Sequence, residues 1–535
     1  MDLRRRPALQ GFGAFLASLA LARAGGGAGA AVAAEGGTLK FGPAEPFTFE
    51  GLVERARRMA REPYVSPPRP APDVVQRIDY DAHGRLRFRP EYALYADGPG
   101  AYPVTFVFMG GFFPKSVQMH ELRDGVAREV LYSPDYFTIP EDSVARQLPP
   151  DASAFAGLWL RESRLSGDWK AKEPWATFLG GCYFRAVGEL GQVGMSARGI
   201  ALDVAGPNPE EFPDFVAHWI EEGAAEGEPV TVCSLLDGPS LAGAYRFRIA
   251  RGSGVVMDIE NHLFMRRDVE RLGVAPLTSM FWYGEYGRER MADWRPEVHD
   301  ADTLVLWNGA NERIVRPLNN PTRIFHTSYS DNNPRGFGLS QRDRNFDHYL
   351  DGVGYDRRPS VWVEPIGDWG RGVVQLVEIP TDDEIYDNIA AYWLPEKPTR
   401  AGDELSFRYR LHWLKDEPHF PANLAKVVAT RMGRGGQPGQ PRPRGLLKFT
   451  IEFLGGELAN LPYGQRPEPN IWASRGQISL VQTDPVPNDV PGHWRTHFDL
   501  AVDGREPVEM RMFLRLGDKT LTETWLYLLE PPVTV

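Results

Sequence analysis

The sequence lacks the residue spacings that identify several common catalytic centres. Cys182 and Cys233 are the two cysteines, and they either form one disulfide or lie buried as small apolar side chains. The 11 histidines show no HExxH or paired-ligand spacing, so neither a metal site nor a cofactor is predicted. A Gly-x-Ser-x-Gly elbow and a glycine-rich phosphate loop are both missing, which disfavours a serine hydrolase and a nucleotide-binding enzyme.

Acidic side chains also outnumber basic ones, 71 to 60. The formal net charge of -11 argues against a nucleic-acid partner, because a phosphate backbone would be repelled. It does not argue against a neutral polysaccharide. Beyond the first few dozen residues the chain has no apolar run of membrane-spanning length, so no stable membrane insertion is predicted.

The first 34 residues have the features of an export signal. Three arginines at 4–6 precede a short apolar run at 12–22, and Ala31-Val-Ala33 is typical of a signal-peptidase site. The arginines favour the twin-arginine route, and an ordinary secretory signal is the alternative. Both routes lead to the periplasm, where the mature chain is expected.

The rest of the chain indicates an all-β protein in more than one domain. The full sequence contains 55 glycines and 46 prolines without a repeat period, which is typical of many turns between short strands. Period-two alternation recurs in residues 38–392, and helices are expected at Phe49–Met59 and around Pro209–Trp219. A proline-rich linker is predicted at 393–401. Strand alternation restarts in residues 402–535, with strands expected at Leu447–Phe453 and Val508–Leu516 among others, at a spacing that predicts an immunoglobulin-like sandwich.

Carboxylates, arginines and aromatics are concentrated between Arg295 and Trp393. Aromatic faces stack on sugar rings and carboxylates move protons, so this composition suits a sugar-cleaving groove. Acids in a turn-rich β protein also commonly lie in solvated turns, and strand tryptophans are commonly core residues. These structural explanations stay open at this point. The candidates are Asp300, Tyr355, Arg358, Trp362, Glu364, Asp368, Trp369 and Asp387.

Seven motifs together resemble one known family, the periplasmic glucan biosynthesis proteins (OpgG/OpgD, also called MdoG/MdoD). They are the segments Tyr183–Ala186, Gly194–Gly199, Ala275–Phe281, Arg295–Asp300, Arg316–Pro321, Asn333–Gly338 and Gly367–Gly370. The likeness runs from about Phe49 to the C-terminus, and the arginine-rich signal favours the D type. It implies a large N-terminal β-sandwich with a long cleft, followed by a C-terminal immunoglobulin-like sandwich.

The resemblance also implies a substrate and roles for individual residues. The substrate class is β-1,2-linked glucan, and the D-type activity is endo-hydrolysis with inversion. Asp387 matches the general acid and Asp300 the general base, while Tyr355 and Arg358 match groove residues that help to pass a proton. Trp362, Glu364, Asp368 and Trp369 are the further glucan-binding candidates. Ile385 departs from the family pattern, because it cannot supply a hydroxyl to a proton relay.

Three functional hypotheses follow from these residues. The leading one is a periplasmic β-1,2-glucan hydrolase that acts on osmoregulated glucans. The alternatives are a non-catalytic glucan-binding or assembly factor and a branching transglycosylase. The sequence leaves open whether the chain forms a homodimer.

Overall fold

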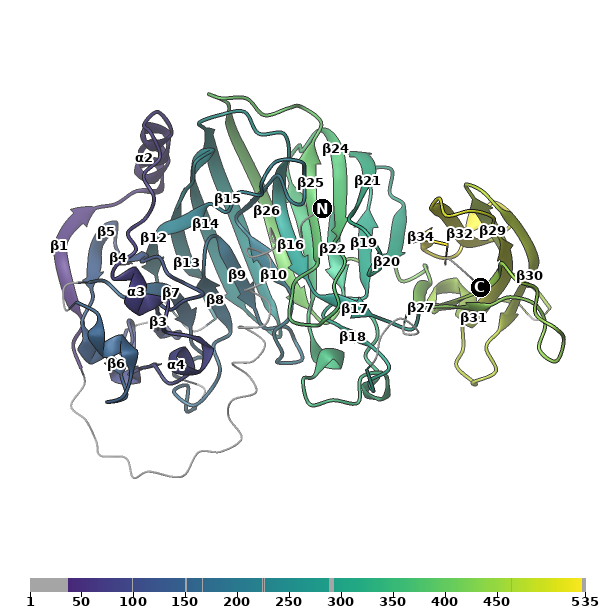
Figure 1. Ribbon diagram of the computed structural model, residues 1–535, viewed down its shortest axis with the longest axis horizontal. Coiled ribbons are helices and arrows are strands. Elements are labelled where there is room, and N and C mark those ends of the chain that lie inside the picture. Colours follow the sequence, from purple (N-terminus) through teal and green to yellow (C-terminus); the bar gives the residue numbers. More distant parts are fainter. Residues whose placement is uncertain are drawn as a thin grey trace.

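The computed structural model describes residues 37–98, 100–149, 152–165, 167–223, 225, 227–287, 293–462 and 464–531. The predicted signal segment, residues 1–34, lies outside this part of the chain. Strands dominate the rest, and the predicted all-β fold is confirmed. Figure 1 shows a large body of strands with a smaller β-sandwich at its C-terminal end.

Two large sheets form most of the molecule. The 16-stranded sheet has the order β1 (Lys40–Pro46), β5 (Val126–Leu131), β4 (Gln118–Arg123), β12 (Asp214–Glu221), β13 (Val230–Asp237), β14 (Leu241–Arg251), β15 (Val255–Met265), β26 (Glu404–Leu414), β23 (Ser360–Ile366), β22 (Gly336–Ser340), β19 (Thr303–Trp307), β20 (Arg313–Pro317), β34 (Thr524–Leu529), β32 (Val508–Leu516) and β29 (Glu468–Ala473), with β33 (Lys519–Thr520) beside β32. The 10-stranded sheet has the order β21 (Phe325–Asn332), β24 (Arg371–Glu378), β25 (Ile389–Pro395), β16 (Leu272–Ser279), β10 (Ser196–Arg198), β9 (Tyr183–Ala186), β8 (Ala176–Leu179), β7 (Phe155–Leu160) and β3 (Val104–Phe108), with β11 (Ile200–Leu202) beside β16.

Smaller elements complete the fold. The remaining sheets are the pair β17 (Phe281–Tyr283) and β18 (Val298–His299), the pair β2 (Arg87–Phe88) and β6 (Phe137–Thr138), and the four strands β27 (Lys426–Arg434), β28 (Leu446–Leu454), β31 (His493–Ala501) and β30 (Gln477–Pro485). The α-helices are α2 (Phe49–Ala60), α3 (Pro72–Val75) and α4 (Tyr80–Gly84), and the 3-10 helices are η2 (Pro90–Tyr92), η3 (Pro134–Tyr136), η4 (Val144–Gln147), η6 (Phe346–His348), η7 (Tyr355–Arg357) and η8 (Gly456–Asn460).

The main hydrophobic core lies between the two large sheets. Tyr245, Phe247 and Ile249 alternate along β14 with more exposed arginines, so one face of this strand is apolar. From the other sheet, the ring of Phe184 on β9 stands 5.0 Å from that of Phe247. Period-two alternation in the sequence therefore produces the packed interface of a sandwich.

Helix α2 covers the opposite face of the 16-stranded sheet. Thr48 caps it by accepting a hydrogen bond from the Gly51 N–H at 3.0 Å, and Leu52 and Ala56 are buried against the sheet. The helix predicted at Phe49–Met59 is confirmed. The helix expected around Pro209–Trp219 is wrong, because the apolar run there forms β12, which pairs with β4 and β13. A short apolar run fits a buried strand as well as a helix.

The two cysteines do not pair. Cys182 and Cys233 are free and buried. Cys182 lies in the main core, whereas Cys233 packs on the α2 side of the 16-stranded sheet. Burial raises the pKa of both thiols. Of the two alternatives that the sequence left open, the structure therefore supports two buried small apolar side chains and not a disulfide.

The C-terminal boundary differs from the expected one. Strand β26, which the sequence assigns to the second domain, pairs with β15 and β23 in the middle of the 16-stranded sheet (Figure 1). Its Tyr409 and Trp413 belong to the main core. The proline-rich segment at 393–401 therefore connects the two large sheets. The second core begins at Ala425, after β26. Local turn signals mark a connection but do not say which sheet the next strand joins.

The C-terminal sandwich packs directly on the end of the large sheet. Its two layers are the four-stranded sheet and the strands β34, β32 and β29, and β34 pairs in parallel with β20. Val305, Val315 and Trp362 of the large body belong to the second core. The strands predicted at Leu447–Phe453 and Val508–Leu516 are present as β28 and β32.

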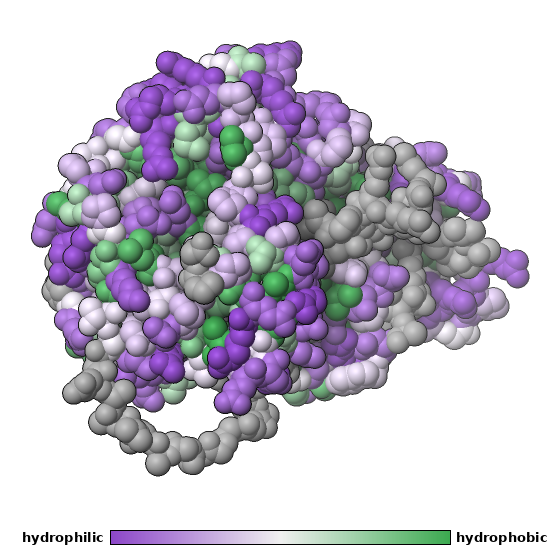
Figure 2. Space-filling view, turned by 60° about the vertical axis from the view of Figure 1, so that its left-hand side comes forward, coloured by the Kyte–Doolittle hydropathy of each residue, from purple (hydrophilic) through white to green (hydrophobic). Residues whose placement is uncertain are grey.

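The surface is mostly hydrophilic, as expected when apolar side chains are buried between the sheets. On the face shown in Figure 2, hydrophobic residues form small separate areas in a mostly hydrophilic surface. Among the described residues, no helix combines the length and the apolar character needed to cross a bilayer.

Candidate functional site

Two buried carboxylates, Asp300 and Asp387, are attached to the same short segment of chain. Asp387 lies two residues before β25, next to Asn388. The side chain of Asn388 accepts a hydrogen bond from the Phe281 N–H at 2.8 Å and donates one to the Phe281 carbonyl at 2.9 Å. Asp300 directly follows β18, and its N–H donates to the carbonyl of Met280 at 2.8 Å. The junction of β16 and β17 thus holds both acids, which lie almost 90 residues apart in the sequence.

The environment of Asp387 favours a protonated carboxyl. Burial, followed by the negative charge of Asp300, raises the pKa of Asp387 to about 6. Arg198 and Arg185 oppose this rise, as does a hydrogen bond with Thr278. Asp387 therefore retains a proton at pH values where an ordinary aspartate has lost it.

Asp300 has a different partner. The guanidinium of Arg358 forms an ion pair with its carboxylate, and both side chains are buried. Burial raises the pKa of Asp300, while the charges of Arg358, His299 and Arg185 oppose the rise. We expect the ion pair to keep Asp300 ionised, because an unpaired buried guanidinium would be costly.

A chain of contacts leads from Asp300 to a loop before β25. The Arg358 guanidinium lies 4.6 Å from the ring centroid of Tyr355. The Tyr355 hydroxyl donates to Oε2 of Glu384 at 2.7 Å, and the same oxygen accepts from Arg295 at 2.8 Å. The structure thus brings Asp300, Tyr355 and Arg358 together and adds Glu384 and Arg295 to them.

Two predicted sugar platforms are wrong. Trp362 is 2 % exposed and packs in the second core, on the side of the C-terminal sandwich. Trp369 is 6 % exposed and contacts the rings of Trp393 and Tyr409 in the main core. Neither ring offers a face to a ligand, because the neighbouring core side chains already cover both rings.

The other two glucan-binding candidates lie in separate environments. Glu364 accepts from His412 on the neighbouring strand β26 at 2.8 Å. Asp368 is exposed in a turn and accepts the N–H of Gly370 at 2.9 Å. The second contact is the ordinary role of an aspartate in a turn. Neither contact connects these residues to the carboxylate pair.

Sequence reasoning missed the polar residues around the acids. Arg185 and Arg198 are buried on neighbouring strands, and Arg198 pairs with Glu210 at 2.6 Å. Thr278 follows on the next strand, β16. The sequence did contain a signal for these residues: Arg185 and Arg198 lie among apolar residues in strand-like segments. A buried charge needs a partner or a function, so such arginines point to a site.

A concavity with aromatic walls lies next to this group. It has a volume of about 550 Å³ and is lined by Phe112, Tyr183 and Phe212, among others. Tyr183 is close to the acids: its pKa is raised chiefly by burial, and the charge of Asp387 contributes. These rings were not among the residues predicted to bind a ligand.

Known proteins resemble this chain over nearly its whole length. The sequence profile of the family described as periplasmic glucan biosynthesis protein, MdoG, matches residues 47–529. Glucans biosynthesis protein D 2 of Ralstonia nicotianae is 56% identical over 499 residues, which cover 92% of each chain. Glucans biosynthesis protein D of Stenotrophomonas maltophilia is 45% identical over 93% of this chain and 92% of its own. The protein of the same description from Xanthomonas oryzae pv. oryzae is 43% identical over 99% and 98%.

Proposed function

Because the chain belongs to the periplasmic glucan biosynthesis protein family, we propose that it trims the β-1,2-linked glucose backbone of periplasmic glucans by inverting endo-hydrolysis. Asp387 is the general acid and Asp300 the general base of this proposal. The periplasm is the proposed location, in line with the description of the family.

The observation that carries the proposal is the difference between the two acids. Glycoside hydrolysis with inversion needs one carboxylic acid to protonate the leaving oxygen and one carboxylate to activate a water. Burial keeps a proton on Asp387, with a pKa of about 6, whereas Arg358 favours the ionised form of Asp300. Two neighbouring carboxyl groups, of which Asp300 is ion-paired with a guanidinium, stand in different environments, and this difference supports an acid and base assignment.

The route of the second proton depends on Tyr355. In this arrangement its hydroxyl donates to Glu384 and not to Asp300. A water that loses its proton to Asp300 must therefore reach that carboxylate directly, or Tyr355 must exchange partners when substrate binds. Ile385, next to Glu384, is 39% exposed and has no hydroxyl to take part.

The aromatic concavity supports a saccharide as substrate. The more exposed rings of Phe112 and Phe212 suit the apolar faces of glucose residues. They take the place of Trp362 and Trp369 in the proposal. Replacement of Phe112 by Ala, at a ring that is 43% exposed, should raise KM for glucan without lowering Tm.

The test is incubation of the purified protein with linear β-1,2-glucan, followed by thin-layer chromatography. Short oligomers that accumulate with inverted anomeric configuration, as measured by NMR, support the proposal. Larger or branched products indicate a transglycosylase instead. Glucan binding without any product contradicts hydrolysis.

A non-catalytic role in glucan assembly is the second candidate. The observation that favours it is the Arg358 ion pair, which occupies the carboxylate of Asp300 that a hydrolase would offer to water. The names of the relatives also refer to glucan biosynthesis. In that case Asp300→Asn would weaken glucan binding, and the parent protein would release no product.

A further inference from the structure

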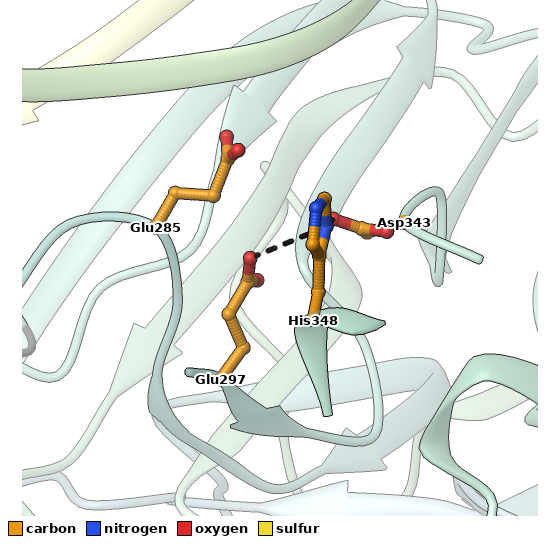
Figure 3. Close-up of side chains that lie close together, drawn as sticks. All are labelled: Glu285, Glu297, Asp343 and His348. Carbon is orange, nitrogen blue, oxygen red and sulfur yellow. Dashed lines mark hydrogen bonds and ion pairs between the residues drawn. The ribbon is translucent and has the colours of Figure 1, made fainter. Parts of the chain in front are cut away.

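Four side chains near β18 lie close together in the manner of metal ligands (Figure 3). Glu285 follows β17, Glu297 precedes β18, Asp343 precedes η6, and His348 is the last residue of η6. One ligand atom from each of the four lies within 4.8 Å of the others. Ligands of a four-coordinate ion bound at about 2.1 Å stand about 3.4 Å apart, so the most distant of these atoms would move closer by up to about 1.4 Å when an ion binds.

Three carboxylates meet one imidazole in this Glu-Asp-His cluster (Glu285, Glu297, Asp343 and His348). Glu297 accepts a hydrogen bond from the buried His299 at 2.9 Å. Glu285 pairs with Arg431 of β27, which also pairs with Glu452, a carboxylate that Arg495 contacts as well. Three carboxylates so close together in a partly buried place repel one another unless a cation neutralises them.

The imidazole of His348 is oriented for binding through Nδ1. Its Nε2 faces the Asn345 side-chain amide at 3.2 Å, and its Nδ1 contacts the carboxylate of Asp343 and lies 3.8 Å from Glu297. The proton that Nδ1 shares with Asp343 occupies the position where a metal would bind. A divalent cation would displace this proton and hold both side chains.

An independent observation comes from the cavity beside the cluster. Glu285, Glu297 and Asp343 line a cavity of about 50 Å³, together with Asp302 and residues of β27. Oδ1 of Asp302 is buried and accepts no hydrogen bond. The volume suffices for an ion and about one water, whose share of liquid volume is about 30 Å³. A water bound to the ion would donate to the unpaired oxygen.

We propose that Glu285, Glu297, Asp343 and His348 bind a divalent transition-metal ion. The mixed oxygen and imidazole set suits Mn²⁺ or Zn²⁺, since Mg²⁺ and Ca²⁺ gain little from a nitrogen ligand. The ion joins the segment after β17, the start of β18 and η6. Because β18 leads directly to Asp300, the ion fixes the segment that carries this acid. Histidine spacing in the sequence does not reveal the site, because the ligands come from separate segments.

Metal binding is tested with the full mature protein after EDTA treatment. Titration with Mn²⁺, followed by the EPR signal of the free ion, should show one ion bound per chain and competition by Zn²⁺. Bound Mn²⁺ should also raise Tm. His348→Ala should weaken binding at least tenfold, and Glu297→Gln combined with Asp343→Asn should abolish it.

A matched control is Glu260→Gln on β15. Glu260 likewise lies beside a histidine, His262 at 3.1 Å, and beside Arg246, but outside the cluster. This variant should bind Mn²⁺ like the parent. Circular dichroism checks the fold of each variant. If the double variant does not fold, His348→Ala alone tests the site, because the His348 side chain is 34% exposed and its loss should be tolerated. No binding to the parent at about 1 mM Mn²⁺, or equal affinity in parent and His348→Ala, would overturn the proposal.

Discussion

Replacement of Asp387 by Asn should stabilise the protein at neutral pH while it removes glucan cleavage. In the folded state the pKa of Asp387 is about 6, compared with 3.8 for an unperturbed aspartate. Below pH 3.8 both states bind the proton. As the pH rises from 3.8 to 6 the unfolded chain ionises first, so folding stability is lost. The loss is complete above pH 6 and amounts to about 3 kcal/mol.

Asn cannot ionise, so the variant does not undergo this loss. Compared with its difference from the parent at pH 4, where part of the loss has already occurred, Asp387→Asn should gain about 2.4 kcal/mol of unfolding free energy at pH 7.5. The lost contact with Thr278 adds an offset that does not depend on pH. Turnover should fall by roughly 10²–10⁴-fold, because the amide cannot donate an acidic proton. In the parent, turnover should decline above about pH 6, as the acid loses its proton.

The assay is urea unfolding at pH 4 and pH 7.5, with turnover on β-1,2-glucan for parent and variant. Asp387→Glu is the conservative control, since it keeps an acidic proton. A variant that is destabilised equally at both pH values would refute the reasoning, because the carboxylate would then be a structural group in its charged form. Turnover equal to that of the parent would remove Asp387 from the mechanism.

Three further predictions concern the fold and the export of the chain. Glu378→Gln should lower the unfolding free energy by about 3–5 kcal/mol, as measured by denaturant unfolding, because the buried Arg316 guanidinium, paired with Glu378 at 2.7 Å, loses its charge partner. Glu396→Gln is the control: its pair with Arg371 is exposed, so the change should stay below about 1 kcal/mol. Trp362→Ala should cost about 3–5 kcal/mol while the glucan Kd of the folded protein stays unchanged, and a weakened Kd by calorimetry would contradict its place in the second core. Lysines in place of the arginines at 5 and 6 should block export, as judged by cell fractionation, whereas normal export would favour the ordinary secretory route.

The sequence by itself determined the class of the fold and several of its elements. Period-two alternation and frequent turns are local properties, so they predicted an all-β chain. The amphipathic pattern at Phe49–Met59 placed α2 correctly. Strand β32 was predicted with its observed bounds for the same reason. The motifs also led to the family, which the near full-length match confirms.

Only the tertiary structure decided which sheet each strand joins. Alternation in β26 says that one face is buried, but not that its partners are β15 and β23. The same limit applies to Trp362, since the sequence cannot tell a ring against the second core from a ring on an open groove.

The acid pair and the Glu-Asp-His cluster depend on the tertiary structure in the same way. Asp300 and Asp387 meet because both are anchored to the junction of β16 and β17, and burial there sets the pKa of Asp387. A pKa depends on the surrounding dielectric and charges, which come from residues distant in sequence. The chain therefore specified the chemical groups, while strand pairing determined which of them act together.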